Sequence, residues 1–302
     1  MRLHVVNETH KTSVPILSLS ADRTKAFVVP ANYPFNELNA EQTALVHVFR
    51  SIHVPSIIAA LTGTPCSDEN ESEFLSDECL VRYLRATKWT LDESVVRLHD
   101  TLQWRREYRP LEVDEDAMKA ICSVGGQYLN GFDKNGHPII FNVARLGSSV
   151  KNYDDSVRFS IYLLEKAIQS MPRGISRVCL LTEYSGANMF NGYPITVTMK
   201  YLDILSKHYP ERSAVNIIVN PSWAIPMLYK LVKPFVDPVT LSKIHFATTD
   251  RTRNVGEYVE QGLGGWLKLT DVIDGDNLPL ELGGDFEFAF DVNEYWKHFM
   301  RK

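Results

Sequence analysis

Glycine, histidine and serine motifs are the first places to look for chemistry in this chain. Gly262, Gly264 and Gly265 form a cluster, but the third glycine of a nucleotide-binding loop is missing and no strand-to-helix pattern surrounds them. The nine histidines are dispersed along the chain. The sequence has no serine nucleophile elbow, no metalloprotease pair and no lysine-containing phosphate loop. We therefore expect a protein that is not an enzyme and binds no metal.

The spacing of the cysteines also gives no sign of a metal site or a redox site. They lie far apart in the sequence, without the close pairs that mark a zinc site or a redox dithiol. Reduced and mostly buried thiols are the ordinary alternative. The four residues are Cys66, Cys79, Cys122 and Cys179.

Residues 222–235 contain more large apolar side chains than one helical face can hold, whereas a surface helix has a narrower apolar stripe. Pro226 lies inside the segment, and Pro234 and Pro238 follow, where proline kinks or ends a helix. Two interpretations remain open: an ordinary buried helix, or a movable cover over an apolar cavity. The apolar residues are Trp223, Ile225, Met227, Leu228, Leu231, Val232 and Phe235.

The elements before about residue 120 are predicted to be helical. Residues 1–36 lack a helical period and are expected to form an irregular arm. A helix is predicted to begin after Asn39, a capping residue, and further helices to begin near Asp77 and Asp92. Residues 61–73 are rich in Thr, Ser, Pro and acidic residues, which is typical of a linker.

Beyond residue 131 short β-branched runs alternate with amphipathic stretches. The runs at 138–143, 177–182, 214–220 and 243–247 predict strands, and residues 156–171 and 195–208 predict helices between them. Such alternation indicates right-handed crossovers and a mostly parallel sheet, which is an α/β fold. Turn residues from 271 onward indicate loops around short extended pieces. We expect an arm (1–36), a helical domain (37–120) and a sheet lobe with a C-terminal extension (121–302).

Composition limits the function further. The formal net charge of -5 argues against a nucleic-acid partner, because such proteins need a basic surplus. The first residues lack the pattern of a secretory leader, and no stretch is expected to reach the roughly 18 apolar residues of a membrane span. We expect a cytoplasmic protein.

Several motifs occur in the order found in one known family. They are the helical strings within residues 79–108, the turn Gly131-Phe132-Asp133-Lys134-Asn135-Gly136-His137-Pro138, Tyr209-Pro210-Glu211-Arg212, Asn220-Pro221, and the string 233–244. With these motifs the chain resembles the CRAL-TRIO lipid-transfer family, and within it the fungal phosphatidylinositol transfer proteins of the yeast secretion-factor type. The resemblance implies an N-terminal helical tripod, an α/β lobe whose sheet floors an apolar pocket, and a gating helix at residues 222–240.

The resemblance also implies a site for a phosphoinositol head group, which requires fixed cations and hydrogen-bonding side chains. The corresponding residues are Lys88, Glu211, Arg212, Thr240 and Lys243. A pairing of Glu211 with Lys243 at the pocket mouth is a hypothesis from their positions in the family. Each of these residues could instead be an ordinary surface charge, part of a salt bridge, or a side chain that links a helix end to a neighbouring loop. Thr87 replaces the basic residue that many members carry before the lysine, which puts the phosphate contact in doubt.

Members that carry phosphatidylcholine hold its phosphate with buried hydroxyl groups. The matching positions here carry no hydroxyl, and a buried phosphate without donors is costly. We therefore predict poor phosphatidylcholine binding and a less polar second ligand, such as a sterol. The positions are Leu129, Ile140, Val178, Leu180 and Leu205.

Together these points predict a monomer that binds phosphatidylinositol without a cofactor and exchanges it between membranes. The protein would visit membrane surfaces transiently and could present its lipid to a phosphoinositide kinase. Two alternatives stay open: a lipid-sensing or protein-binding scaffold without transfer, and a haem-binding member of the fold that uses His208 or His245.

Overall fold

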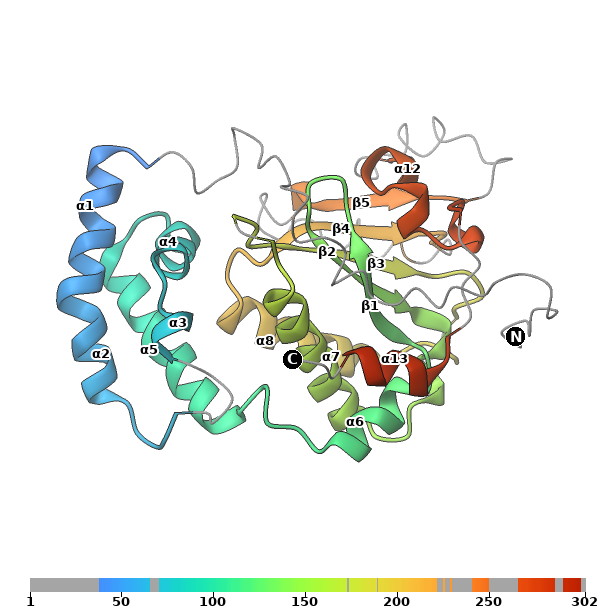
Figure 1. The fold of residues 1–302 in the computed structure, drawn as a ribbon, viewed down its shortest axis with the longest axis horizontal. Coiled ribbons are helices and arrows are strands. Elements are labelled where there is room, and N and C mark those ends of the chain that lie inside the picture. The colour runs from blue at the N-terminus through green and yellow to red at the C-terminus, as the bar shows by residue number, and fades with distance from the viewer. Residues whose placement is uncertain are drawn as a thin grey trace. The chain divides into compact units, whose positions relative to one another are not determined.

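The computed structural model describes residues 38–65, 71–172, 174–188, 190–221, 225, 229, 241–249, 266–285 and 290–299. Their contacts group them into two units (Figure 1). The helical unit comprises residues 38–114 and 196–212, and the sheet unit comprises the other described residues. Residues 196–212 therefore group with the N-terminal helices although they follow the third strand of the sheet. The division at residues 36 and 120 stays a prediction.

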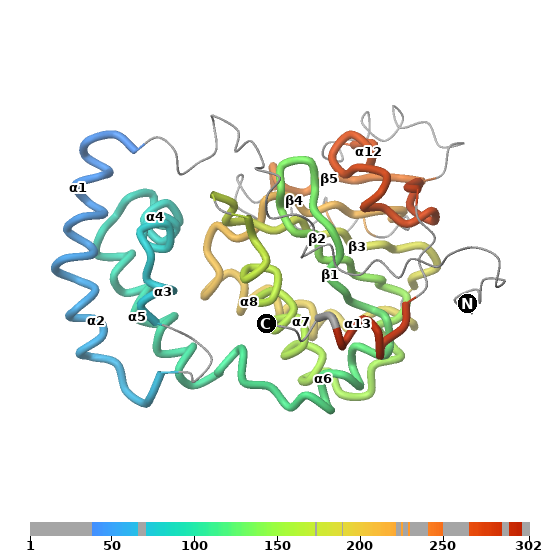
Figure 2. The backbone as a smooth tube through the Cα atoms, viewed as in Figure 1, coloured from blue at the N-terminus to red at the C-terminus, as the bar shows by residue number. Residues whose placement is uncertain are grey.

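The helical unit begins with a continuous rod (Figure 2). It consists of α1 (Ala40–Val48), a π-helical turn (Phe49–His53) and α2 (Val54–Ala60). Asn39 caps α1 as predicted, because its side chain accepts a hydrogen bond from the Gln42 amide at 2.8 Å. An 18-residue window of this rod has a mean hydropathy of 1.3, so by length and composition alone it could cross a membrane, which the sequence analysis did not expect of any stretch. Its inner face nevertheless packs against protein.

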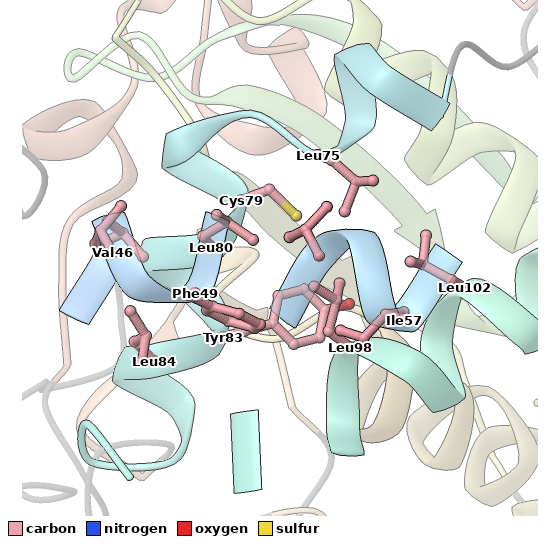
Figure 3. Packing of buried hydrophobic residues seen from close by; sticks show 12 residues of the cluster. Val46, Phe49, Ile57, Leu75, Cys79, Leu80, Tyr83, Leu84, Leu98 and Leu102 are labelled. Carbon is pink, nitrogen blue, oxygen red and sulfur yellow. The ribbon is translucent and has the colours of Figure 1, made fainter. Parts of the chain in front are cut away.

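The core of the helical unit lies between this rod and two further helices (Figure 3). These are α4 (Asp77–Ala86) and α5 (Leu91–Tyr108), which confirm the predicted helices, and the short α3 (Glu71–Phe74) precedes them. Apolar residues recur every three or four positions, so one face of each helix is buried. The core residues include Val46, Phe49, Ile57, Leu80, Tyr83, Leu84, Leu98 and Leu102.

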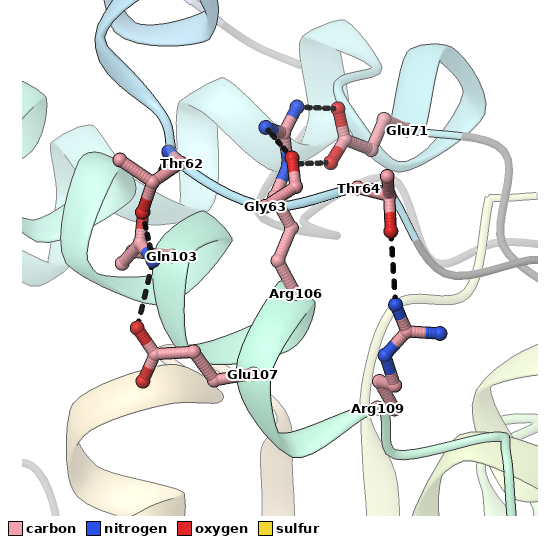
Figure 4. A network of polar contacts seen from close by, with 8 residues as sticks. All are labelled: Thr62, Gly63, Thr64, Glu71, Gln103, Arg106, Glu107 and Arg109. Carbon is pink, nitrogen blue, oxygen red and sulfur yellow. Dashed lines mark hydrogen bonds and ion pairs between the residues drawn. The ribbon is translucent and has the colours of Figure 1, made fainter.

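The predicted linker is tied to α5 by polar contacts (Figure 4). Arg106 binds both carboxylate oxygens of Glu71, at 2.7 and 2.9 Å, and donates to the carbonyl oxygen of Gly63 at 3.0 Å. Arg109 donates to Thr64 at 3.0 Å. A two-pronged arginine–carboxylate pair is geometrically specific, so the described part of the linker is held to the helix rather than only connecting two helices.

The sheet unit is built on five strands in the order β1-β2-β3-β4-β5. They are β1 (Gln127–Phe132), β2 (Pro138–Val143), β3 (Val178–Glu183), β4 (Ser213–Val219) and β5 (Ile244–Ala247). Strands β2 to β5 are parallel, which confirms the predicted α/β class, and β1 is antiparallel to β2. β1 is not predicted from the sequence, because Asn130-Gly131 is typical of a turn. In the structure Gly131 bends the strand with φ +62.

A hairpin joins β1 to β2 and explains one of the sequence motifs. Asp133, which is 4% exposed, accepts hydrogen bonds from the amides of Asn135 and His137, both at 2.9 Å, and its other oxygen lies 2.8 Å from His137 Nδ1. Gly136 adopts φ +82, which glycine tolerates without strain. The motif 131–138 therefore fixes the register of the first two strands.

Helices alternate with the strands along the sequence, and α7 (Tyr153–Gln169) packs on β1 and β2. A 3₁₀ turn (Ala144–Ser149) and α7 connect β2 to β3, and α8 (Ile195–His208) lies between β3 and β4 in the sequence. α6 (Glu115–Cys122) precedes β1, and α13 (Val292–Phe299) packs beside α6. The predicted helices at 156–171 and 195–208 are confirmed.

The described C-terminal region differs from the prediction of loops around extended pieces. It contains α12 (Leu269–Val272) and the 3₁₀ turns Gly275–Asn277 and Leu280–Leu282. This region packs on the hairpin between β1 and β2: the Lys134 amide donates to the carbonyl oxygen of Val272, the last residue of α12, at 2.8 Å. Short helical turns lack the periodicity that sequence patterns need.

Candidate functional site

One face of the sheet carries two parallel rows of side chains. Paired residues on neighbouring strands point to the same face, so the strand register defines each row. The first row is Leu129, Ile140, Leu180, Asn216 and Ile244. The second row is Gln127, Asn142, Thr182, Ile218 and Phe246. This face is largely apolar, with a polar stretch on the first three strands of the second row.

Two different elements cover the ends of this face. Over β1 lies α7, whose Ser160 hydroxyl donates to Gln127 Oε1 at 2.7 Å. Over β4 and β5 lie Ile225 and Tyr229, which pack in one cluster with Phe246. The rings of Tyr229 and Phe246 meet edge to face with centroids 5.4 Å apart. The two covers leave the middle strand between them.

The middle strand is partly exposed on this face only. Leu180 and Thr182 are partly exposed, whereas Cys179, Leu181 and Glu183, which alternate with them, are buried. An interior strand of a parallel sheet is normally buried on both faces. The partial exposure continues on β4 at Asn216 and Ile218 and on β5 at Ile244. In the part of the chain that the structure describes, a mainly apolar strip of the sheet is thus only partly covered between α7 and the side chains of Tyr229 and Phe246, and we call it the uncovered strip.

On β1 and β2 the opposite face of the sheet is closed by aromatic packing, whereas Val215 on β4 and His245 on β5 are partly exposed there. Tyr128 and Phe141 stack with ring centroids 4.9 Å apart and planes 8° from parallel, and Phe290 packs on Tyr128. A cavity of about 50 Å³ beside them has room for a water molecule or two but not for a hydrocarbon chain. Among the described residues, the face with the two rows is the one on which the middle strand carries partly exposed side chains.

Four of the five predicted pocket positions come together on this face. Leu129, Ile140 and Leu180 are consecutive members of the first row, and Val178 lies on the same side of β3 as Leu180. Leu129 is fully buried and Leu180 is partly exposed, so the row runs from covered to uncovered. Leu205 is partly exposed on α8 in the helical unit.

The predicted gating segment is described only at Ile225 and Tyr229. Both contact the cluster over β4 and β5, so these two residues lie on the face with the uncovered strip. The other predicted gate residues lie outside the described residues, as do Thr240 and the glycine cluster at 262–265. They are Trp223, Met227, Leu228, Leu231, Val232 and Phe235.

Lys88 follows the end of α4 and is exposed. It and Trp89 both have positive φ, +52 and +67, and the Trp89 amide bonds to the carbonyl oxygen of Leu84 at 2.6 Å. Such left-handed residues end a helix sharply. The Thr87 hydroxyl lies 2.6 Å from the buried Ser94 hydroxyl and within 3.2 Å of the Tyr83 carbonyl oxygen. Thr87 therefore joins α4 to α5.

The motif 209–212 follows α8 in the same unit as Lys88. Tyr209 is buried against Trp104, and the Pro210 carbonyl oxygen accepts a hydrogen bond from the buried Arg82 at 3.2 Å. Glu211 and Arg212 are partly buried, and Glu211 has φ +58. Through these contacts the motif holds the turn after α8 against α4 and α5.

Lys243 belongs to the sheet unit, where its carbonyl oxygen accepts a hydrogen bond from the Asn216 amide at 2.7 Å. Its side chain is partly buried at the entry to β5. Lys88, Glu211 and Arg212 lie in the helical unit, so the pairing of Glu211 with Lys243 stays a hypothesis.

Asn220, from another sequence motif, joins the carboxyl ends of the parallel strands. Its Nδ2 donates to Ser185 and Thr249, both at 2.9 Å, and its Oδ1 accepts from the Thr249 amide at 2.8 Å. The residue has φ +49, a conformation that asparagine tolerates better than most residues. Asn220 thus fixes the point where the chain leaves β4 toward the predicted gate.

The other candidate chemical groups are engaged in packing. Cys79, Cys122 and Cys179 are free and buried, and burial raises the pKa of the Cys122 thiol to about 12. His208 stacks on Trp104, and its Nδ1 lies 3.3 Å from the Thr101 hydroxyl. His245 is partly exposed on β5. Among the described ranges, no group of three His, Cys, Asp or Glu side chains could hold a metal ion.

A groove of about 720 Å³ lies on the helical unit between α5 and the end of α8. Its lining includes Asp92, Glu93, Asp100, Arg97 and Lys207. A groove with this many charged side chains does not suit hydrocarbon chains.

The polar stretch Gln127, Asn142 and Thr182 is not among the residues predicted from the sequence. Gln127 was missed because β1 was not predicted. The other two could have been found from the two-residue period of a strand, which places Asn142 beside Ile140 and Thr182 beside Leu180 on one face.

The chain is similar to known families over most of the described structure. Residues 123–284, more than half of the chain, match the CRAL/TRIO domain, and residues 41–100 match the CRAL/TRIO N-terminal domain. The crystal structure of Sfh5 superimposes with a TM-score of 0.55 at 23% identity, covering 82% of this chain and 96% of that one. At this identity the likeness shows the fold alone.

Curated relatives include two yeast proteins and a third fungal protein. A CRAL-TRIO domain-containing protein of Schizosaccharomyces pombe is 30% identical over 228 residues, which cover 76% of this chain and 21% of that protein. Phosphatidylinositol transfer protein PDR17 of Saccharomyces cerevisiae is 31% identical over 205 residues, covering 61% and 57%. Phosphatidylinositol transfer protein CSR1 of Eremothecium gossypii is 26% identical over 228 residues, covering 71% and 48%. The chain therefore spans about a fifth to somewhat over half of these relatives.

Proposed function

The chain belongs to the CRAL-TRIO family, and on that premise we propose that it binds phosphatidylinositol on the uncovered strip of its sheet and transfers it between membranes. The observation that carries this proposal is the partial exposure of Leu180 and Thr182 on the middle strand, on one face only. Two relatives are named phosphatidylinositol transfer proteins, which supports the choice of lipid.

The energetics favour a large apolar site rather than a surface contact. A diacyl lipid has two chains of about sixteen methylene groups, and hiding them from water stabilises the complex by on the order of 25 kcal/mol. Leu180 is the partly exposed member of the first row that would contact such a ligand, and the segment around Ile225 and Tyr229 would cover the site in water. We expect that cover to open at a membrane, where its apolar side chains gain a lipid environment.

The head group would bind through cations at the edge of the site. From the family resemblance, Lys88, Thr240 and Lys243 are the proposed phosphate partners, and Glu211 and Arg212 are further proposed head-group residues. Thr87 supplies no charge, and its hydroxyl already contacts Ser94, so Lys88 would act there alone. The proposed role is non-catalytic, as a monomer without a cofactor. Transient membrane association and presentation of the lipid to a phosphoinositide kinase belong to the same proposal.

Lipid extraction from the purified protein tests the proposal first. Native mass spectrometry should find phosphatidylinositol bound in a one-to-one complex. Transfer of labelled phosphatidylinositol between vesicles should then depend on added protein, and phosphatidylcholine should be transferred poorly. A protein without bound lipid and without transfer would instead be a scaffold, and the proposal would be wrong.

Charge reversal tests the head-group residues separately. Lys243→Glu should lower phosphatidylinositol transfer about tenfold or more, because it removes a charge-assisted contact to the phosphate and adds repulsion. Lys268→Glu is the matched control, since Lys268 is an exposed lysine of the same unit. Unchanged transfer in both variants would remove Lys243, and with it the pairing to Glu211, from the site.

A further inference from the structure

The groove between α5 and the end of α8 is a large cavity that lipid binding does not use. Its volume of about 720 Å³ is within the range of about 300–1,000 Å³ that is usual for ligand sites. Two contacts within the helical unit join its walls. The Arg97 guanidinium donates to the Ser206 carbonyl oxygen, and His208 stacks on Trp104. The groove is therefore preformed, and a ligand would not have to open it.

The lining of the groove presents a surplus of negative charge. Asp92, Glu93 and Asp100 are exposed carboxylates from α5. Within the part of the chain that the structure describes, Asp92 and Glu93 form no hydrogen bond or ion pair with another side chain. The two cations of the lining are already engaged, because the arginine binds the end of α8 and Lys207 pairs with Asp203 at 2.8 Å. A cationic ligand would find free carboxylates here.

An apolar side chain interrupts these carboxylates. Val96 is 60% exposed and lies midway between Asp92 and Asp100 on α5. Residues four apart share one face of a helix and are separated by about 6 Å along its axis. The face therefore reads carboxylate, isopropyl group, carboxylate. The facing wall is the last turn of α8, whose carbonyl ends add partial negative charge.

We propose that this groove binds a basic segment of a partner protein, with an apolar side chain on Val96 and a lysine or arginine on either side, against Asp92 and Asp100. A helical segment would present these three side chains four residues apart. A linear polyamine would match the carboxylates but would offer nothing branched to pack on Val96. The inference goes beyond the proposed function and does not depend on lipid binding, because every lining residue lies in the helical unit.

A designed peptide tests the site directly. The probe is a fluorescein-labelled peptide of about eighteen residues in an alanine and glutamine background, which is long enough to form a helix, with lysine, leucine and lysine spaced four residues apart. Fluorescence anisotropy measures its binding to the full chain at low salt. The wild type should bind it about five- to tenfold more tightly than a peptide with glutamine in place of leucine. Added salt should weaken the binding, because the carboxylates are exposed.

Two variants separate the groove from the net charge of the protein. Asp92→Lys should lower the affinity about tenfold or more, because it turns an attraction into a repulsion. Val96→Gln should remove the preference for leucine. Glu78→Lys is the matched control, since Glu78 is an exposed first-turn acid of α4 outside the lining and the variant changes the net charge equally. It should bind the peptide as the wild type does, and circular dichroism checks that each variant is folded.

Three results would overturn the inference. They are a wild type that does not bind the leucine peptide, an equal loss of affinity in Asp92→Lys and Glu78→Lys, and a preference for leucine that survives in Val96→Gln. Phosphatidylinositol transfer is measured separately, so none of these results bears on the proposed function.

Discussion

The imidazole ring of His208 lies flat on the indole of Trp104, with ring centroids 4.3 Å apart and planes 6° from parallel. Burial and the neighbouring Lys207 lower the pKa of His208 to about 4, against the weaker opposing effect of Asp203. The ring is therefore neutral at pH 7. It packs the end of α8 onto α5 through Trp104 and the Thr101 hydroxyl.

This packing predicts an acid-sensitive helical unit. Below its ordinary pKa of about 6.5, His208 takes up a proton in the unfolded chain but not in the folded one, so stability falls as the pH drops from about 6.5 to about 4. Because solvent reaches part of the ring, the loss is on the order of 1 kcal/mol. His208→Phe keeps the stacking and should flatten this part of the profile in urea unfolding. His47→Gln, which replaces an exposed histidine, is the control and should keep the wild-type dependence of stability on pH. If stability fell equally with pH in the wild type and both variants, His208 would not be the group responsible.

Gly131 and Asn277 form a second testable pair. Gly131 has φ +62, and a Cβ added there would lie 2.1 Å from Asn277 Oδ1, so alanine would meet both backbone strain and a clash. Gly131→Ala should destabilise the protein by about 2–4 kcal/mol, of which about 1 kcal/mol is the cost of a left-handed alanine. Asn277→Gly should recover most of the remainder in the double variant. Additive effects in thermal unfolding would mean that the 3₁₀ turn at 275–277 does not dock on β1.

The sequence predicted the regular elements better than the site. The capping residue Asn39 and the run 138–143 defined a helix start and a strand because periodicity and capping are local properties. β1 was missed because its Asn130-Gly131 bend is held by the C-terminal turn at Asn277, a contact far away in the sequence. Likewise, the uncovered strip depends on which distant segments pack on Leu180. The local sequence around Leu180 does not show how fully those segments cover it.

Asn220 should be one of the most sensitive positions in the sheet unit. Asn220→Gly keeps the left-handed backbone but removes the contacts to Ser185 and Thr249, so we expect a loss of about 1.5–3 kcal/mol. Asn220→Ala should cost about 1 kcal/mol more, because alanine also strains the backbone at φ +49. Urea unfolding measures both. If alanine were no worse than glycine, the backbone conformation at Asn220 would not contribute.

Leu180 and Leu181 are adjacent residues on opposite faces of β3 and provide the most direct test of the uncovered strip. Leu181 is fully buried, so Leu181→Trp should overpack the closed face and destabilise the protein by about 3 kcal/mol or more. Leu180 is partly exposed between the two covers, so Leu180→Trp should cost less than about 1 kcal/mol. The added ring would nevertheless occupy the strip where the lipid is proposed to lie, and phosphatidylinositol loading should fall about tenfold or more. Thermal unfolding and native mass spectrometry measure the two effects on the same samples. A stable Leu180→Trp protein that loads lipid normally would show that the ligand does not use this face, whereas an unstable one would show that the strip is already filled.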